Sequence, residues 1–355
     1  MNKMDNYKKH TGRKKLFIII LGILVLILFL VTVSVGSIKY NIFDLFGTLF
    51  GNGTAQSEIV IFDIRMPRAF TAIFVGAALA TAGTIMQNVL RNPLASASTL
   101  GVSQGAAFGA AVGIIVFGAG TQNSSAAASA IVINNPYIVT ICAFIGGFIS
   151  TAVVLVLSRL KNLSPSALVL VGIALSSLFG GGLTLLQYFA SDVQISAIVF
   201  WTFGDIGRAG KIEVLIIGIF TVIAYVYFIL NKWNYNALVS GVHTAKSLGV
   251  NVNRTILISM AVCSLISAIA VAFVGIISFV GLVSPHLVKR VVGNDYKYLI
   301  PASALCGSLM LLIADLVGRM IISPVVLPIG AITSFFGAPV FLYLIYIGGK
   351  NGKSY

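Results

Sequence analysis

Long apolar runs recur along the whole chain, and they limit its fold more than any other feature. A membrane-crossing helix needs about 20 mostly apolar residues, because the hydrocarbon core is about 30 Å thick. Of the 355 residues, 58% are hydrophobic and only 9% are charged, whereas about 25% are charged in a soluble domain. We therefore predict an all-α integral membrane protein with about ten transmembrane helices in one bundle. The candidate spans are residues 16–36, 67–90, 98–117, 136–158, 167–188, 212–231, 255–274, 278–292, 299–319 and 328–348.

The same runs divide the chain into one membrane domain with short polar ends. The expected segments are a basic cytoplasmic tail at 1–15, a ten-helix transmembrane domain at 16–348 with a cytoplasmic loop at 233–254, and a cytoplasmic tail at 349–355. The first apolar run follows a basic segment, as a signal peptide would, but it is about 20 residues long. No small-residue cleavage site follows it cleanly, so we interpret it as an uncleaved first helix.

The distribution of basic residues predicts the orientation of the bundle. When the N-terminus is placed in the cytoplasm and ten spans alternate, 17 of the 23 lysines and arginines fall on the cytoplasmic side, as the positive-inside rule requires. An even number of spans places both termini in the cytoplasm, whereas an odd number would remove this bias. The net charge of +14 therefore marks the cytoplasmic face, and we expect no nucleic-acid partner.

Ionisable residues are almost missing from the predicted spans. Of the Asp, Glu, Lys and Arg residues, only Asp315 lies more than three residues from the end of a predicted span, whereas ion-coupled carriers and proton pumps usually need several such groups. Asp315 and Arg319 are four residues apart, so they share a helix face and could form a structural pair near the outer end of a span. Two other classes stay open at this point. A secondary transporter would need more buried charge, and a membrane enzyme would need a polar catalytic cluster at one face.

No pattern in the sequence predicts a metal ion or a cofactor. The three cysteines lie in apolar runs without a CxxC spacing, which favours small buried hydrophobic side chains. The histidines lack metal-ligand spacing, and we interpret His286 as structural or interfacial. The cysteines are Cys142, Cys263 and Cys306, and the histidines are His10, His243 and His286.

The C-terminal tail imitates a phosphate-binding loop but fails its spacing. A P-loop requires a glycine five positions before its Gly-Lys-Ser end, and here Ile347 stands five positions before Gly352. We therefore expect no ATP site and no enzyme activity in this chain. Any ATP hydrolysis that its function requires must then be carried out by a partner protein.

Four stretches of small or polar residues interrupt the apolar runs. They are Arg65-Met66-Pro67-Arg68 with Gly76 to Gly83 and Gln87, then Arg91 to Ala95 with Leu100-Gly101-Val102, then Ala245 to Val250, and finally Phe279 to Arg290. Small residues on one helix face let transmembrane helices approach closely, and Pro67 suits the first turn of a helix. Residues 276–286, with Gly281 and Pro285, should be irregular at one end, which is tolerated only where protein or water covers the backbone.

The order and spacing of these stretches resemble one family of membrane proteins. With Leu327-Pro328-Ile329-Gly330, Gly337-Ala338-Pro339 and Phe341, they resemble the permease subunits of ABC importers for iron–siderophore complexes, haem and cobalamin (FecCD-like type II importers). The resemblance runs from about residue 58 to residue 348. It implies a ferric siderophore as substrate, with haem or cobalamin as alternatives, carried by alternating access. It also implies a bacterial inner (plasma) membrane location.

The resemblance implies three kinds of protein partner. A second permease subunit, identical or related, would complete a dimer. Two ATP-binding subunits would dock on the cytoplasmic face, and a separate substrate-binding protein would deliver the ligand to the outer face. The segment from Leu238 to Gly249 would form short coupling helices seated in the ATPase, with Gly249 as a helix stop. The residues expected to form this contact are Leu238, Val239, Ser240, Gly241, Ala245, Lys246, Leu248 and Gly249.

Two further sites follow from the same resemblance. Arg65, Arg68 and Arg319 would bind acidic side chains of the binding protein, because a guanidinium pairs bidentately with a carboxylate. Headgroup contact or a local ion pair with Glu58, Asp63 or Asp315 is the alternative. Pro165 and Ser166 would line an inner gate, although Ser164 and Pro165 also suit a simple helix start.

Overall fold

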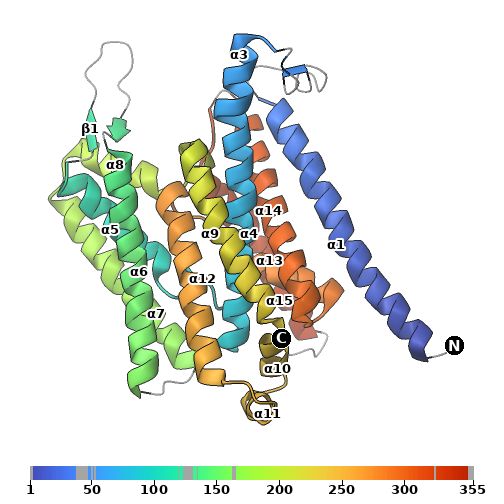
Figure 1. The fold of residues 1–355 in the computed structure, drawn as a ribbon. Helices are drawn as coiled ribbons and strands as arrows, with labels where there is room; N and C mark the ends of the chain where they lie inside the picture. Colours follow the sequence, from blue (N-terminus) through green and yellow to red (C-terminus); the bar gives the residue numbers. More distant parts are fainter. Residues whose placement is uncertain are drawn as a thin grey trace.

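The computed structural model describes residues 3–36, 47–48, 51, 53–118, 120–122, 131–133, 135–161, 165–323 and 325–350, and these form a bundle of helices (Figure 1). The helices are α1 (Lys3–Ser34), α3 (Ala55–Glu58), the π-helical η1 (Ile59–Arg65), α4 (Met66–Val89), α5 (Val102–Ile115), α6 (Pro136–Lys161), α7 (Pro165–Tyr188), α8 (Asp192–Thr202), the 3-10 turn η2 (Ile206–Arg208), α9 (Lys211–Leu230), α10 (Lys232–Val239), α11 (Val242–Ser247), α12 (Val252–Val274), α13 (Val280–Val292), α14 (Tyr296–Met320) and α15 (Ile329–Lys350). Two three-residue strands, β1 (Gly120–Gln122) and β2 (Ile131–Ile133), pair antiparallel between α5 and α6.

Each predicted span contains a helix, and the helical fold class is confirmed. Among the described residues, seven segments are long and apolar enough to cross a membrane: Thr11–Ser34, Ala55–Val89, Pro136–Leu157, Ala167–Tyr188, Lys211–Leu230, Val252–Val274 and Tyr296–Met320. The other three predicted spans correspond to α5, α13 and α15. The described apolar parts of α5 and α15, Val102–Ile115 and Ile329–Leu344, are shorter, and α13 has 13 residues. The total of ten crossings therefore stays a prediction.

The short helix α8 was not predicted. It begins with a capping box, in which the Ser191 hydroxyl accepts from the backbone N–H of Gln194 and the Gln194 side chain accepts from the N–H of Ser191. Such reciprocal bonds satisfy two donors that the first helical turn leaves open. Because α8 has only 11 residues, it is too short to be recognised as a membrane span.

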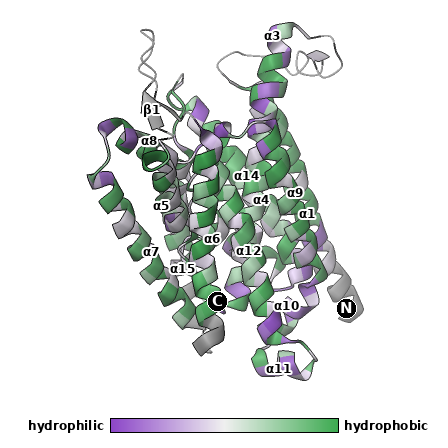
Figure 2. Cartoon of the chain, turned by 60° about the vertical axis from the view of Figure 1, so that its left-hand side comes forward, coloured by the Kyte–Doolittle hydropathy of each residue, from purple (hydrophilic) through white to green (hydrophobic). Residues whose placement is uncertain are grey.

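The helices surround α4. Helix α4 packs against α9, α12, α13 and α14, while α1 leans against α14 at one edge and α5 packs against α6 and α7 at the other. Helices α10 and α11 lie at the end where α1 begins and α15 ends, and we call this the inner end. Helices α3 and α8 lie at the opposite, outer end (Figure 1). Hydrophilic residues gather at the two ends and hydrophobic residues cover the length between them (Figure 2), as a bilayer requires.

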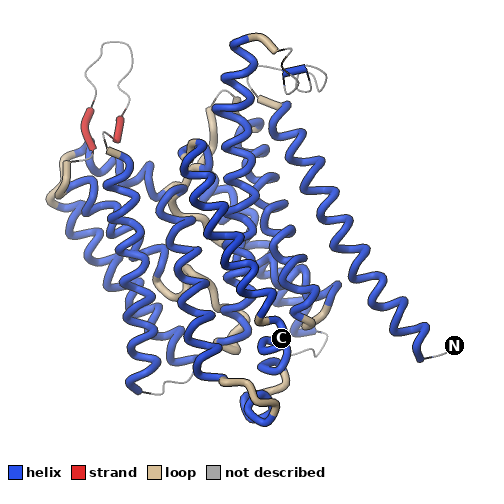
Figure 3. The backbone as a smooth tube through the Cα atoms, viewed as in Figure 1, coloured by secondary structure: helices blue, strands red, loops and turns tan. Residues whose placement is uncertain are grey.

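Non-helical backbone passes between the helices within the bundle (Figure 3). Helix α12 ends at Val274 and α13 begins at Val280, so the stretch 276–286 is irregular at its first end, as predicted. Gly281 and Pro285, on which the prediction rested, lie inside α13. The Val274 carbonyl accepts from the backbone N–H of Asp205 at 2.7 Å. The start of α15 is bonded nearby, since the Gly330 N–H donates to the Phe203 carbonyl at 3.0 Å. Protein therefore covers this break and satisfies part of its backbone.

The small-residue face of α4 makes the closest helix contacts, as its sequence predicted. A Cβ atom on Gly76 would overlap the backbone of Gly307 in α14, and a Cβ on Gly83 would overlap Gly281 in α13. These glycines let the backbones touch, which strengthens van der Waals packing in a bundle that lacks a hydrophobic drive between helices.

We expect Gly307→Val to lower the free energy of unfolding by at least about 1–3 kcal/mol, because the added side chain overpacks the α4–α14 contact. Thermal denaturation in detergent, followed by circular dichroism, measures the loss. Gly22→Val in α1 is the matched control, since a Cβ at Gly22 meets no atom within 4 Å. Equal unfolding temperatures for the two variants would contradict the assignment of this contact.

Candidate functional site

The predicted coupling segment folds into two short helices, α10 and α11, at the inner end of the bundle (Figure 1). Gly241 separates them with a φ of 116°, a conformation that disfavours any side chain. Gly249 follows α11 with a φ of 82°. Its N–H donates to the Lys246 carbonyl at 2.9 Å, and the Val250 N–H donates to the Ala245 carbonyl at 3.0 Å. These two bonds form a Schellman motif, so the helix stop predicted at Gly249 is confirmed.

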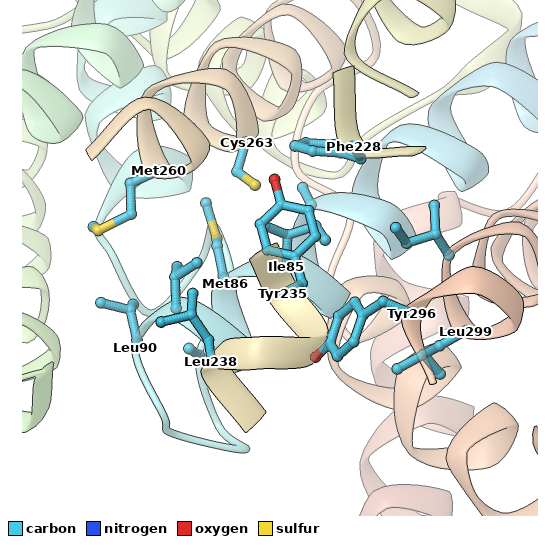
Figure 4. Close-up of a cluster of buried hydrophobic side chains, with 14 of the residues drawn as sticks. Ile85, Met86, Leu90, Phe228, Tyr235, Leu238, Met260, Cys263, Tyr296 and Leu299 are labelled. Atoms are coloured by element: carbon cyan, nitrogen blue, oxygen red, sulfur yellow. The ribbon is translucent and has the colours of Figure 1, made fainter. Parts of the chain in front are cut away.

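Aromatic side chains hold α10 against the bundle. Tyr235 is fully buried, and its ring lies 5.7 Å from the ring of Tyr296 in α14. The Tyr235 hydroxyl shares a hydrogen bond of 2.9 Å with the Ser259 hydroxyl of α12. Figure 4 shows both rings inside a cluster that also contains Ile85 and Leu238. Burial of two large aromatic side chains stabilises this attachment by several kcal/mol, at about 1.5–3 kcal/mol for each large side chain.

Polar contacts fix the same helix to its neighbours. The Asn88 side chain donates to the Tyr235 carbonyl at 3.1 Å, which ties the end of α4 to α10. The Asn236 side chain donates to Asp295 at 3.0 Å and accepts from the Tyr296 N–H at 2.8 Å, which ties α10 to the start of α14. A force on α10 therefore acts directly on α4 and α14, which pack closely against each other at Gly76 and Gly307.

The predicted coupling residues divide into an anchored set and an exposed set. Leu238 and Ala245 are buried, whereas Val239, Ser240, Lys246, Leu248 and Gly249 are exposed and Gly241 is half-buried. Val239 and Leu248 expose 49% and 68% of their surface. The two helices thus form a projection with a packed underside and an apolar outer surface, a shape that fits insertion into a groove of another protein.

At the outer end, a buried carboxylate joins two of the predicted docking arginines. Asp315 is fully buried in α14. Its Oδ1 lies 2.6 Å from the Arg68 Nε, and its Oδ2 lies 3.0 Å from the Arg319 Nε. The Asp315–Arg319 pair predicted from the i, i+4 spacing is therefore confirmed. Arg68 also lies 3.4 Å from the half-exposed carboxylate of Asp205.

Arg65 and Arg319 also donate hydrogen bonds to backbone carbonyls at the end of α1. The Arg65 Nη1 donates to the carbonyls of Val33 at 2.9 Å and Ser34 at 2.7 Å. Arg319 donates to the carbonyls of Val35 at 3.0 Å and Thr32 at 3.1 Å. The last carbonyls of a helix lack intrahelical partners and carry partial negative charge, so two guanidinium groups suit this position. The name outer arginine cluster is used below for Arg65, Arg68, Arg319 and Asp315.

The outer arginine cluster is occupied by groups of the chain itself. Arg65 is buried, and the side chains of Arg68 and Arg319 expose only 13% and 11% of their surface. Two of the three arginines, Arg68 and Arg319, form the local ion pair with Asp315 that was the alternative to docking. Their docking role stays a prediction, and a carboxylate arriving from outside would have to compete with these internal partners. Sequence reasoning offered Asp315 only as one of three possible acidic partners and could not select it for Arg68, because the two residues are 247 positions apart.

The predicted inner gate falls at the start of α7. This helix begins at Pro165 and includes Ser166, as the alternative interpretation of a helix start requires. Ser164 lies outside the described residues, so its predicted capping role is not described. The gate itself stays a prediction.

Two of the three cysteines are buried, as the sequence interpretation expected, and the third, Cys142, is not. Cys263 and Cys306 are buried and Cys142 is half-buried, each as a free thiol. The His286 Nδ1 lies 2.7 Å from the Leu282 carbonyl, and its ring lies edge-on to Phe341 at 5.4 Å. Within the described part of the chain, no group of three or more His, Cys, Asp or Glu side chains is placed to hold a metal ion.

Comparisons with known proteins agree on one family. The profile of the FecCD transport family matches residues 24–346. An ABC transporter permease protein of Methanocaldococcus jannaschii is 49% identical over 97% of this chain and 98% of its own length. The permease protein of an Fe(3+)-citrate import system of Bacillus subtilis is 34% identical over 95% of this chain and 98% of its own. A solved structure, described as an inward-facing conformation of a metal-chelate type ABC transporter, has a TM-score of 0.78 and 28% identity, and the match covers 93% of this chain and 98% of that one.

Proposed function

This chain belongs to the FecCD transport family, and on that premise we propose that it is the membrane permease of an ABC importer for a ferric chelate, most simply a ferric siderophore. A second permease chain, identical or related, completes the pathway. Two ATP-binding subunits bind at the inner end, and a substrate-binding protein delivers the chelate at the outer end. The chain has no ATP site of its own. It spans a bacterial plasma membrane ten times, with both termini in the cytoplasm.

The observation that carries this proposal is the anchored projection of α10 and α11. Its apolar surface, at Val239 and Leu248, is exposed, while Tyr235 and Asn236 bind it to α12 and α14. When the ATPase pair closes, the projection moves with it as a rigid lever, and α4 and α14 move with the lever. Rigid-body movement of packed helices is a common form of switching between two conformations, so inward and outward access alternate.

The pathway itself is passive in this mechanism. Selectivity comes from the binding protein, and the free energy comes from ATP hydrolysis by the partner. Pro165 and Ser166, at the inner start of α7, line the gate through which the chelate leaves. Arg65, Arg68 and Arg319 receive the binding protein, whose carboxylates replace internal partners of these guanidinium groups as it docks.

Reconstitution tests the function. The permease is placed in proteoliposomes with its ATPase and its binding protein, and uptake of ⁵⁵Fe-labelled ferric siderophores is followed with and without ATP. We expect accumulation against the concentration gradient only when all three components and ATP are present. Parallel samples with labelled haem and cobalamin identify the class of chelate.

Omission experiments separate this proposal from an ion-coupled transporter. Uphill uptake by the permease alone, lost when the proton or sodium gradient is collapsed, would replace the ABC mechanism with secondary transport. Ligand-stimulated ATP hydrolysis by the full complex, without any uptake, would contradict the role of the chain as a pathway.

A further inference from the structure

Residues from the region where α12 packs between α6 and α9 line a small pocket. The segments that supply them meet at the outer end of the bundle (Figure 1). The cavity volume of the pocket is about 80 Å³. Its walls come from the start of α6, the end of α8, the η2 turn, the start of α9 and the end of α12. The lining residues used below are Tyr137, Trp201, Arg208, Glu213 and Phe273.

The guanidinium group of Arg208 places a positive charge at this pocket, and it forms no salt bridge with a carboxylate of the described residues. Its Nη2 donates to the Phe200 carbonyl at 3.2 Å, but its Nη1 is buried and has no hydrogen-bond partner among the described residues. Asp205, whose charge acts on Arg208, accepts from the Gly207 N–H and pairs with Arg68. A buried guanidinium nitrogen without a partner costs free energy, and an anion in the pocket beside Arg208 would supply the missing acceptor.

Glu213 brings the opposite charge to the same pocket. It lies in the first turn of α9, and its Oε1 accepts from the Tyr137 hydroxyl at 3.0 Å. No cation of the described chain lies within ion-pair distance of this carboxylate, since the salt bridges of the outer end use Asp63, Asp205 and Asp315. The pocket therefore offers one positive and one negative group, which are not paired with each other.

Apolar side chains continue from the pocket towards the middle of the membrane domain. On α6, Ile141 and Phe148 lie four and eleven residues after Tyr137, so they share its helix face, and they expose 57% and 46% of their surface. On α9, Phe220 and Ile223 lie seven and ten residues after Glu213 and expose 39% and 60%. Apolar surface of this extent below a charged pocket matches the arrangement of acyl chains below a headgroup.

We propose that this pocket binds the headgroup of one zwitterionic phospholipid of the outer leaflet, with its phosphate at Arg208 and its ammonium group at Glu213. Guanidinium groups bind phosphate bidentately, and an exposed tyrosine such as Tyr137 is typical of the membrane interface. The acyl chains lie along the exposed faces of α6 and α9. An acidic side chain of a soluble partner would satisfy Arg208 only, whereas a phospholipid satisfies both charges and the apolar faces.

The two tryptophans of the chain make a direct binding assay possible. Trp201 lines the pocket, while Trp233 is exposed in α10 at the inner end. In a Trp233→Phe background, Trp201 is the single tryptophan and can be excited selectively at the red edge of its absorption, where tyrosine does not absorb. The delipidated protein in detergent is titrated with phosphatidylethanolamine that carries a nitroxide at the 5-position of an acyl chain. We expect quenching of Trp201 that saturates at a small mole fraction of this lipid.

Arg208→Gln in the same background should shift the half-saturation point to an about tenfold higher mole fraction, since it removes the charged contact to phosphate. Glu213→Gln should abolish the preference for phosphatidylethanolamine over nitroxide-labelled phosphatidylglycerol. Lys211→Gln, whose side chain is 63% exposed and pairs with Asp63, is the matched control and should leave the curve unchanged. Inorganic phosphate at millimolar concentration should not displace the lipid.

Three results would overturn the proposal. One is quenching of Trp201 in the Trp233→Phe protein that rises linearly with the lipid mole fraction and does not saturate. The pocket would then be assigned to an acidic group of a partner protein. Another is displacement by inorganic phosphate alone, which would assign the site to the free ion. The third is an Arg208→Gln curve identical to that of the wild type. If this variant is not monodisperse in detergent, Arg208→Lys and Glu213→Gln are compared in its place, and unchanged curves for both would overturn the proposal equally.

Discussion

Asp315→Ala is expected to lower the free energy of unfolding by about 3–5 kcal/mol, because it leaves two largely buried arginines without their shared carboxylate. Asp315 is fully buried between Arg68 and Arg319, at 2.6 Å and 3.0 Å. The side chains of Arg68 and Arg319 expose only 13% and 11% of their surface, so water can replace little of the lost carboxylate. Thermal denaturation in detergent, followed by circular dichroism, measures the loss.

Two controls separate the loss of a buried charge from a general effect at the outer end. Asp63→Ala breaks the exposed pair with Lys211, whose side chains are 50% and 63% exposed, and should change stability by less than about 1 kcal/mol. The triple variant Arg68→Met, Asp315→Leu, Arg319→Met should regain much of the loss, since apolar groups can replace a buried ion network. Equal losses for Asp315→Ala and Asp63→Ala would contradict the buried network.

Leu248→Asp is expected to reduce ATP-driven uptake by at least about 30-fold, which corresponds to the 2 kcal/mol or more typical of a residue at the centre of an interface. Leu248 exposes 68% of its surface on the projection, so the change should not disturb the fold of the permease. It places an unpaired charge where an apolar contact with the ATPase is proposed. Uptake in proteoliposomes and co-purification of the ATPase measure the two parts of this effect.

The control is a change to aspartate of an exposed apolar residue at the outer end of the bundle. Val116 exposes 64% of its surface just after α5, and Val116→Asp should leave ATPase binding unchanged. Unchanged uptake and ATPase binding in Leu248→Asp would remove α11 from the proposed contact. Loss of uptake with normal ATPase binding would instead place the defect in transmission through α10.

The two ends of the molecule differ in how their sites relate to the fold. At the inner end, exposed residues such as Leu248 are separate from the buried residues that hold them, such as Tyr235. At the outer end, Arg65 and Arg319 also hold the end of α1. Charge reversal of Arg65 or Arg68 therefore tests docking only when the stability of each variant is measured beside the binding of the partner.

Much of this protein was predictable from local patterns in its sequence. The apolar runs predicted the helices, because every backbone polar group in a bilayer must be satisfied within its own segment. The glycines of α4 predicted close contacts, Gly249 predicted the end of α11, and the i, i+4 spacing predicted the Asp315–Arg319 pair. Each of these depends on residues within one continuous segment of the chain, so no knowledge of the tertiary structure was needed.

Only the tertiary structure decided what lies beside these elements. The Arg68–Asp315 pair, the capping of α1 by Arg65 and Arg319, and the pocket between Tyr137, Arg208 and Glu213 each join segments far apart in the chain. An arginine at the outer end has the same sequence signature whether it faces a partner or a buried carboxylate. Its role is set by which helix packs opposite, because in a low-dielectric interior a charge is stable only where that neighbour supplies a partner.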